Sequence, residues 1–249
     1  MNGGKVVWIF RGIIELETAI EKSDDIIKLN EKFYTTKNIL NAENSIIDTV
    51  KSGKNAAEPL LTSKEFLEQT GNSETYKQLT DDQKNAVEAI KNDLSQNRQA
   101  RRVIVGDVGC GKTTVILALA AMVGKNKTAL LAPTSILARQ IYEEATKYLP
   151  LKTVLVTQSS NAKDDEIQNA DFLIGTHALL YKKLPPCAAV AVDEQHRFGT
   201  NQRRLIAALV SDGKDRPHYF QFSATPIPRT QALIEASLAE LTLIKQMPI

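Results

Sequence analysis

The sequence is poor in the features that define several protein classes. Only two cysteines occur among its 249 residues, Cys110 and Cys187, and they lie too far apart for a C-x-x-C spacing. This argues against a disulfide framework or a zinc site built on cysteine pairs. No apolar run approaches the roughly 18 residues that a membrane-spanning helix needs, and no small-residue cleavage site follows the apolar stretch 6–10. We therefore expect a cytoplasmic chain without a membrane partner.

Charge of one sign and aromatic residues are also scarce. The formal net charge is only +2, so any contact with nucleic acid has to come from local loops and helix ends rather than from a global basic field. Aromatic residues make up 6% of the chain, and we find no cluster of them that would form a platform for base stacking. A nucleic-acid contact, if there is one, is expected to involve the sugar-phosphate backbone.

What the sequence does contain is an alternating pattern between residues 101 and 222. Short β-branched runs alternate with longer amphipathic stretches, which is typical of βαβ units and a parallel sheet. The pattern predicts strands near 102–105, 128–132, 153–157, 171–175, 188–192 and 218–223, and helices beginning near Lys112, Ser135, Asn201 and Pro228. Right-handed crossovers would place these helices on both faces. We expect an α/β fold with a doubly wound, mainly parallel sheet.

The first 75 residues have a different character. Apolar residues recur at helical spacing over 12–30, a second helix is predicted to begin after Thr35 or Thr36 and to stop at Gly53, and a third to follow Ser63. Residues 69–75 are rich in polar and turn-forming residues and are predicted to form a linker. The expected organisation is a small, mainly helical appendage with its linker over 1–75, of unknown role, followed by a nucleotide-binding domain over 76–249.

A glycine-rich loop follows the first predicted strand and opens a helix. Gly106, Asp107, Val108, Gly109, Cys110, Gly111, Lys112 and Thr113 fit the pattern G-x-x-x-x-G-K-[ST] in the context that this pattern requires. Glycines let backbone N–H groups turn toward phosphate oxygens, and the helix start favours the same anion. The loop predicts ATP binding by these residues and Thr114, with Lys112 on the β and γ phosphates and Thr113 on a magnesium ion.

An acidic motif, Asp193-Glu194-Gln195-His196, ends the apolar strand 188–192. A doubly wound nucleotide fold needs a carboxylate near its phosphate loop. Asp193 is predicted to hold magnesium, and Glu194 to orient or deprotonate the attacking water. Lys112, Thr113, Asp193, Glu194 and His196 are the candidate catalytic residues, although a lone histidine such as His196 is often purely structural.

Residues 193–199, Asp-Glu-Gln-His-Arg-Phe-Gly, together with 223–230, Ser-Ala-Thr-Pro-Ile-Pro-Arg-Thr, resemble the pattern of the RecG helicase family. The resemblance covers about 78–249 and does not extend to the first 75 residues. Transcription-repair coupling translocases are similar at the second of these motifs but usually carry D-E-E-Q where this sequence has Asp193-Glu194-Gln195-His196. That difference favours RecG.

The resemblance implies the first RecA-like motor domain of a bacterial, nucleoid-associated, ATP-dependent DNA helicase or translocase. Such an enzyme acts on branched DNA in replication-fork repair and recombination, with ATP and Mg²⁺ as cofactors. It implies that His196, Ser223, Ala224 and Thr225 couple the nucleotide state to motion against a second RecA-like domain. It also implies that two further segments contact the DNA backbone, through Pro133, Thr134, Gly175, Thr176 and His177.

Some alternatives remain open at this stage. Gln83, in Leu79-Thr80-Asp81-Asp82-Gln83, resembles a helicase element that reads adenine, but Thr80 and Gln83 also fit a helix capping box. The chain could instead come from a coupling-type DNA translocase, or be a nucleotide-binding module that does not hydrolyse. Because the resemblance covers only one motor domain, we expect weak or negligible unwinding by this chain alone.

Overall fold

The computed structural model describes residues 25–28, 34–37, 57, 60, 79–160, 162–211, 216–224 and 239–248. Its internal contacts divide the chain into two compact units, Met1–Lys51 and Ser52–Ile249. Among the described residues, no helix combines the length and the apolar character needed to cross a bilayer.

The described part of the first unit is a pair of short strands. Strand β1 (Ile26–Lys28) pairs antiparallel with β2 (Tyr34–Thr36). The helix predicted over 12–30 is therefore wrong at Ile26–Lys28, because the β-branched Ile26 and Ile27 lie opposite Thr36 and Thr35, and such residues favour a pleated pair. Beyond Lys37, the second predicted helix lies outside the described residues, as do the third predicted helix, the linker at 69–75 and the boundary near 75.

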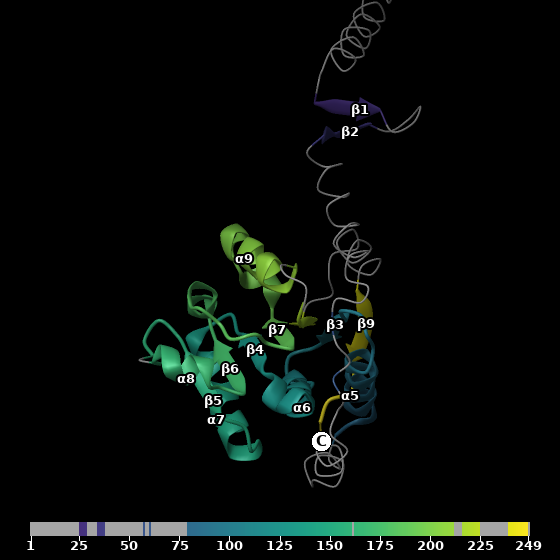
Figure 1. Cartoon of the computed structure of the whole chain (residues 1–249). Coiled ribbons are helices and arrows are strands. Elements are labelled where there is room, and N and C mark those ends of the chain that lie inside the picture. The colour runs from purple at the N-terminus through teal and green to yellow at the C-terminus, as the bar shows by residue number, and fades with distance from the viewer. Residues whose placement is uncertain are drawn as a thin grey trace, which may run out of the picture. The chain divides into compact units, whose positions relative to one another are not determined.

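The second unit contains a seven-stranded parallel sheet with the order β5-β6-β4-β7-β8-β3-β9. Six strands lie where the sequence predicted them, and the edge strand β9 beside β3 was not predicted (Figure 1). The strands are β3 (Arg101–Gly106), β4 (Thr128–Leu131), β5 (Thr153–Val156), β6 (Phe172–Gly175), β7 (Ala189–Asp193), β8 (His218–Ser223) and β9 (Glu240–Ile244).

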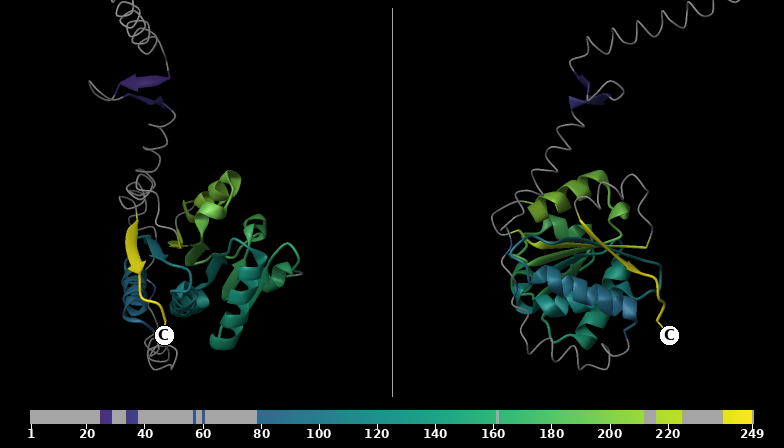
Figure 2. Two further views of the ribbon diagram at one scale, coloured as in Figure 1. Left: turned by 180° about the vertical axis from the view of Figure 1, so that it is seen from behind. Right: turned by 90° about the vertical axis from the view of Figure 1, so that its right-hand side faces the viewer.

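Helices cover both faces of this sheet, which confirms the doubly wound prediction. The right-hand view of Figure 2 shows the green helix α9 on one side of the sheet and the blue helix α5 on the other. The helices are α5 (Asp81–Leu94), α6 (Lys112–Val123), α7 (Ser135–Tyr148), α8 (Asp164–Gln168) and α9 (Thr200–Ser211), with short 3-10 turns η1 (Gly124–Asn126), η2 (His177–Tyr181) and η3 (Gln195–Arg197). The helix predicted from Pro228 lies outside the described residues.

Alternating side chains of the strands build two separate cores. In β4, Leu130 packs with the core that contains α5, α6 and α7, whereas Ala129 and Leu131 pack with the core that contains α8 and α9. All three of these side chains are fully buried. A parallel strand covered on both faces has to be apolar throughout, and the carboxyl ends of the strands are left at one edge to form a site.

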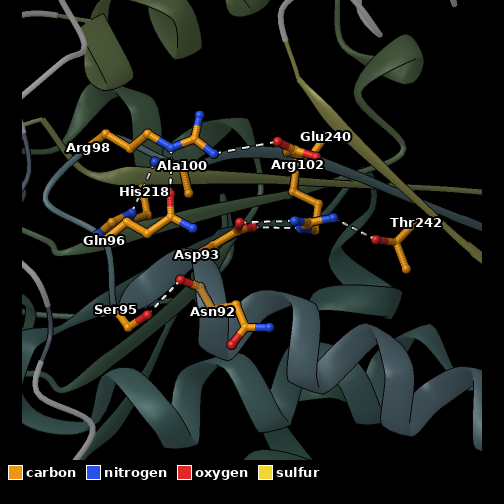
Figure 3. A network of polar contacts seen from close by, with 10 residues as sticks. All are labelled: Asn92, Asp93, Ser95, Gln96, Arg98, Ala100, Arg102, His218, Glu240 and Thr242. Carbon is orange, nitrogen blue, oxygen red and sulfur yellow. Dashed lines mark hydrogen bonds and ion pairs between the residues drawn. The ribbon is translucent and has the colours of Figure 1, made fainter.

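A buried ion pair fixes the edge of the sheet that carries β3 and β9 (Figure 3). Arg102 of β3 donates two hydrogen bonds to the Asp93 carboxylate of α5, and its Nη1 donates to Thr242 Oγ1 of β9 at 2.9 Å. Both charged groups are nearly inaccessible. Removal of one partner from such a pair generally costs about 3–5 kcal/mol, so this network holds α5, β3 and β9 in one arrangement.

Candidate active site

The glycine-rich loop connects the end of β3 to the start of α6. Gly109 and Gly111 have φ angles of +89° and +83°, in the left-handed region that side chains disfavour. A methyl group on Gly106 would lie 2.5 Å from Cys110 Sγ and 2.9 Å from the carbonyl oxygen of Ile244. The loop geometry therefore requires glycine at these positions, as the sequence pattern predicts.

The start of α6 is arranged to receive an anion. No side chain caps its first turn among the described residues, and no acidic residue lies in that turn, so its N–H groups face the loop with the positive end of the helix dipole. Lys112 Nζ donates to the carbonyl oxygens of Gly106 and Asp107, at 2.5 and 3.0 Å. These contacts keep the ammonium group within the loop, where a phosphate could take over its hydrogen bonds.

The sheet order brings the acidic motif close to this loop. Strand β8 lies between β7 and β3, and all three strands are parallel. The ends at Asp193, Ser223 and Gly106 consequently share one edge of the sheet. The positive charge of Lys112 also acts on the Asp193 carboxyl. The glycine loop and the carboxylates thus line one site, as a nucleotide-hydrolysing centre requires.

Asp193 is a buried carboxyl with an unsatisfied oxygen. Its residue is only 7% exposed, and its Oδ1 has no hydrogen-bond partner in the described part of the chain. Burial, followed by repulsion from the Glu194 carboxylate, raises the pKa of Asp193 to about 6, against the lowering effects of Lys112 and Arg197. A buried acceptor that lacks a partner is a natural ligand for a hard cation.

The raised pKa gives a pH dependence that can be tested without nucleotide. Between about pH 4 and pH 6 the folded chain holds a proton on Asp193 that the unfolded chain has released, so stability from this group is lost as pH rises through this window. Asparagine does not titrate, so Asp193→Asn should not show this loss of stability. The unfolding free energy of the variant minus that of the parent should therefore rise by roughly 2–3 kcal/mol from pH 4 to pH 6 and then level off. Urea unfolding at several pH values, without divalent cations, measures it. Parallel profiles would contradict the raised pKa.

Glu194 connects the acidic motif to the end of β8. Its Oε1 accepts from the Ala224 N–H at 2.7 Å and its Oε2 from the Ser223 hydroxyl at 3.2 Å, and His196 Nδ1 lies 3.4 Å from Oε2. Glu194 also has a left-handed backbone, with φ +50°, a strained conformation that is concentrated at functional sites. The structure thus brings together three of the four predicted coupling residues; Thr225 lies outside the described residues.

The capping box predicted for Thr80 and Gln83 is confirmed, and the adenine-binding role of Gln83 stays a prediction. Thr80 Oγ1 accepts from the Gln83 N–H at 3.3 Å, and Gln83 Oε1 accepts from the Thr80 N–H at 2.9 Å. The same side chain has a contact that the sequence did not predict, because its Nε2 donates to the Cys110 carbonyl at 2.7 Å. Gln83 therefore ties the start of α5 to the phosphate loop.

The two segments predicted to contact DNA, 133–134 and 175–177, both lie at the edge of the sheet formed by the carboxyl ends of the strands. They follow the neighbouring strands β4 and β6, and the Ala132 N–H donates to the Gly175 carbonyl at 2.8 Å. Thr134 is exposed and caps α7 through its hydroxyl, whereas Thr176 is buried and its hydroxyl accepts from the Ala178 N–H. Only the first segment presents its hydroxyl at the surface.

A cavity of about 930 Å³ lies at the opposite end of the sheet. It is lined by residues at the amino ends of β4, β7 and β8, among them Ala129, Ala188 and His218. None of the predicted site residues borders it. The candidate site is instead the open edge formed by the phosphate loop and the ends of β7 and β8.

Comparison with known proteins agrees with this geometry. Residues 80–234 match the model of the DEAD/DEAH box helicase family. The chain belongs to the DEAD/DEAH box helicase family. The matched range contains the capping box, the phosphate loop and the acidic motif.

Comparison with individual relatives gives a more specific result than the family model. The chain is 47% identical over 179 residues to the ATP-dependent DNA helicase RecG of Helicobacter pylori, a match over 68% of this chain and 28% of that protein. It is 34% identical over 179 residues to the transcription-repair-coupling factor of the same organism, 18% of whose length is matched. The predicted resemblance to RecG is confirmed, and the chain spans under a third of the relative's length.

Solved structures support the same fold. A structure of RecG bound to a three-way DNA junction superposes with a TM-score of 0.64 at 27% identity, over 84% of this chain and 29% of that chain. A DEAD box protein from Methanococcus jannaschii matches with a TM-score of 0.52 at 20% identity, over 76% of this chain and 53% of that one. The second likeness concerns the fold alone. The predicted RecA-like α/β domain is confirmed.

Proposed function

We propose that this chain is the ATP-binding and ATP-hydrolysing domain of a RecG-type DNA helicase. The observation that carries the proposal is the juxtaposition of the phosphate loop after β3 with Asp193 and Glu194 after β7, across the end of β8. A triphosphate between these segments would meet backbone N–H groups, a lysine and two carboxylates, which are the parts that phosphoryl transfer requires.

Mg²⁺ fits the donors of this site. The unpartnered, buried Asp193 Oδ1 and the hydroxyl of Thr113 are hard oxygen donors of the kind that the ion prefers. Mg²⁺ would neutralise charge on the phosphate oxygens during transfer. In the proposed site Thr113 and Asp193 hold the cation, and Lys112 exchanges its bonds to loop carbonyls for bonds to phosphate oxygens.

The protein's own part in hydrolysis is to orient water and to sense the phosphate. Glu194 is an acceptor held from two sides by Ser223 and Ala224, so its orientation is fixed before substrate binds. We assign it the role of general base or water-orienting group. His196, Ser223, Ala224 and Thr225 would then transmit loss of the γ-phosphate, since a change at Glu194 alters its contacts with His196, Ser223 and Ala224.

DNA is the proposed polymer substrate. Support comes from the RecG relatives and from the RecG structure that contains a three-way junction. Pro133 and Thr134 are the stronger candidates for backbone contacts, because the Thr134 hydroxyl is exposed; Gly175, Thr176 and His177 would act mainly through backbone groups. A second RecA-like domain of the parent protein would complete the motor, and residues 1–75 remain a separate appendage in this proposal.

Two alternatives are weaker. A coupling-type DNA translocase would share the fold and the phosphate loop, but the identity to the coupling factor of Helicobacter pylori is 34%, against 47% to RecG of that organism. A module that binds MgATP without hydrolysing it would still use Asp193 for the cation, but it would not need a second carboxylate held in a fixed orientation by Ser223 and Ala224. Glu194 therefore favours the enzyme.

The test is ATP hydrolysis by the purified chain with forked DNA, linear duplex or no DNA. We expect MgATP to bind, and hydrolysis to be stimulated more by the fork than by duplex of the same composition. Failure to bind MgATP would overturn the proposed site. Binding with no hydrolysis under any of the three conditions would favour the non-hydrolysing module, whereas equal stimulation by both DNAs would remove the preference for branched DNA.

A further inference from the structure

The segment after β9 lies against the candidate nucleotide site, far along the chain from the motifs that build it. The backbone N–H groups of Lys245 and Gln246 both donate to Asp82 Oδ2, at 2.8 and 2.9 Å. Gln246 Oε1 in turn accepts from the Asp82 N–H at 3.3 Å. Asp82, in the first turn of α5, thus holds residues 245–246 by three hydrogen bonds. These backbone bonds also lower the pKa of Asp82, which keeps its carboxylate ionised.

The next two residues reach the phosphate loop itself. A methyl group placed on Gly111 would lie 3.7 Å from Pro248 Cγ, and one placed on Gly109 would lie 3.9 Å from Met247 Sδ. Both are ordinary van der Waals distances, so residues 247–248 lie beside the two glycines whose left-handed backbone shapes the loop. The Met247 side chain is 55% exposed, and an exposed thioether at this position is available to a ligand.

Gln83 lies on the same side of the phosphate loop as residues 247–248. Its amide nitrogen occupies the space where a side chain on Gly111 would have to project, and it bonds to the Cys110 carbonyl. Gln83, the loop glycines and Met247–Pro248 therefore converge on one side of the loop. The carboxylates of β7 act from the β8 side of β3, whereas β9 pairs with its other edge. When the triphosphate occupies the loop, the attached sugar and base must extend out of the loop. The side of the loop formed by Gln83, Met247 and Pro248 lies away from the carboxylates.

We propose that residues 245–248, tethered by Asp82, form one wall of the base-binding part of the nucleotide site, with Met247 in contact with the purine ring of ATP. The inference rests on the proposed function, since it requires a nucleoside triphosphate in the loop. Thioether sulfur makes favourable contacts with aromatic rings and adapts its shape to them, and the Pro248 ring adds an apolar surface. The wall is built from a segment with no helicase motif, and Asp82 supplies its anchor.

The experiment compares a ligand with a base and a ligand without one. MgATP and inorganic tripolyphosphate are titrated against the parent chain and against Asp82→Ala, Met247→Ala and Lys112→Ala. Asp82→Ala and Met247→Ala should each weaken ATP binding by about three- to tenfold, the range expected for loss of a sulfur–ring contact, and should leave tripolyphosphate binding unchanged. Lys112→Ala should weaken both ligands.

Matched controls are available in the same turn of α5. Asp81 is exposed and makes no contact with residues 245–248 that the structure describes, so Asp81→Ala should bind both ligands as the parent does. Asp82→Asn keeps an acceptor oxygen for the two N–H groups and should recover most of the ATP affinity that Asp82→Ala loses. Met247 is exposed, so its replacement tests the wall without disturbing the fold.

The outcomes separate the two proposals. If the parent binds neither ligand, the proposed function itself fails. If the parent binds both ligands and Lys112→Ala weakens both, while Asp82→Ala and Met247→Ala bind ATP like the parent, only the base wall is overturned. Equal weakening of ATP and tripolyphosphate by Asp82→Ala would also overturn it, because the segment would then be supporting the phosphate loop rather than the base.

Discussion

Lys112→Ala is expected to abolish detectable nucleotide binding while leaving the fold intact. The Lys112 ammonium group already lies within the loop, bonded to the carbonyls of Gly106 and Asp107. Alanine removes the only side-chain cation of the loop pattern 106–113. Each hydrogen bond to a charged group contributes about 1.5–3 kcal/mol, so the loss of two phosphate contacts should weaken MgATP binding by about a hundredfold or more. Calorimetric titration of MgATP into the purified chain measures the effect.

The control for this prediction is Lys125→Ala. Lys125 is exposed in the η1 turn that follows α6, at the end of the helix away from the phosphate loop. Its replacement removes the same charge and should leave the affinity unchanged. Thermal unfolding of both variants without nucleotide checks that the domain is folded. An affinity of Lys112→Ala equal to that of Lys125→Ala would show that the phosphates bind elsewhere.

The core of the sheet could be predicted from sequence because its signals are local. Strands such as 188–192 are continuous apolar runs, as burial on both faces requires. The glycine-rich loop is recognisable from its residue types and their spacing. Strand β9 gave a weaker signal, since Leu241 and Leu243 are exposed and, among the described strands, β9 has a neighbour on one edge only. The short strand at Ile26–Lys28 was mistaken for part of a helix because three residues are too few to establish a period.

Contacts between distant segments could not be predicted in this way. The sequence explains Asp82 fully as a helix-start residue that suits the dipole, and nothing local indicates that it accepts hydrogen bonds from residues 163 and 164 positions away. Gln83 shows the same limit, since the capping box was visible and the bond to the Cys110 carbonyl was not. The Asp82 contacts depend on β9 pairing beside β3, and the Gln83 bond depends on how the start of α5 packs against the phosphate loop.

Glu194→Gln is expected to stop ATP hydrolysis while preserving ATP binding. Glutamine is isosteric with glutamate, and its oxygen can still accept from the Ala224 N–H while its amide nitrogen donates to the Ser223 hydroxyl. The hydrogen bonds to β8 survive, but the side chain can no longer accept a proton from water. General-base catalysis contributes about 10²- to 10⁴-fold, so the rate with forked DNA should fall by that factor with little change in the dissociation constant for MgATP.

A matched carboxylate far from the site separates this role from a general loss of charge. Glu88 is exposed on α5 and pairs only with Lys91 among the described residues, so Glu88→Gln should hydrolyse ATP at the parent rate. If Glu194→Gln also hydrolysed ATP at the parent rate, the base would have to be another group. If it lost MgATP binding instead, Glu194 would be holding the nucleotide or its cation. The roles proposed for the two carboxylates would then be reversed, and Asp193, with its raised pKa, would be the proton acceptor.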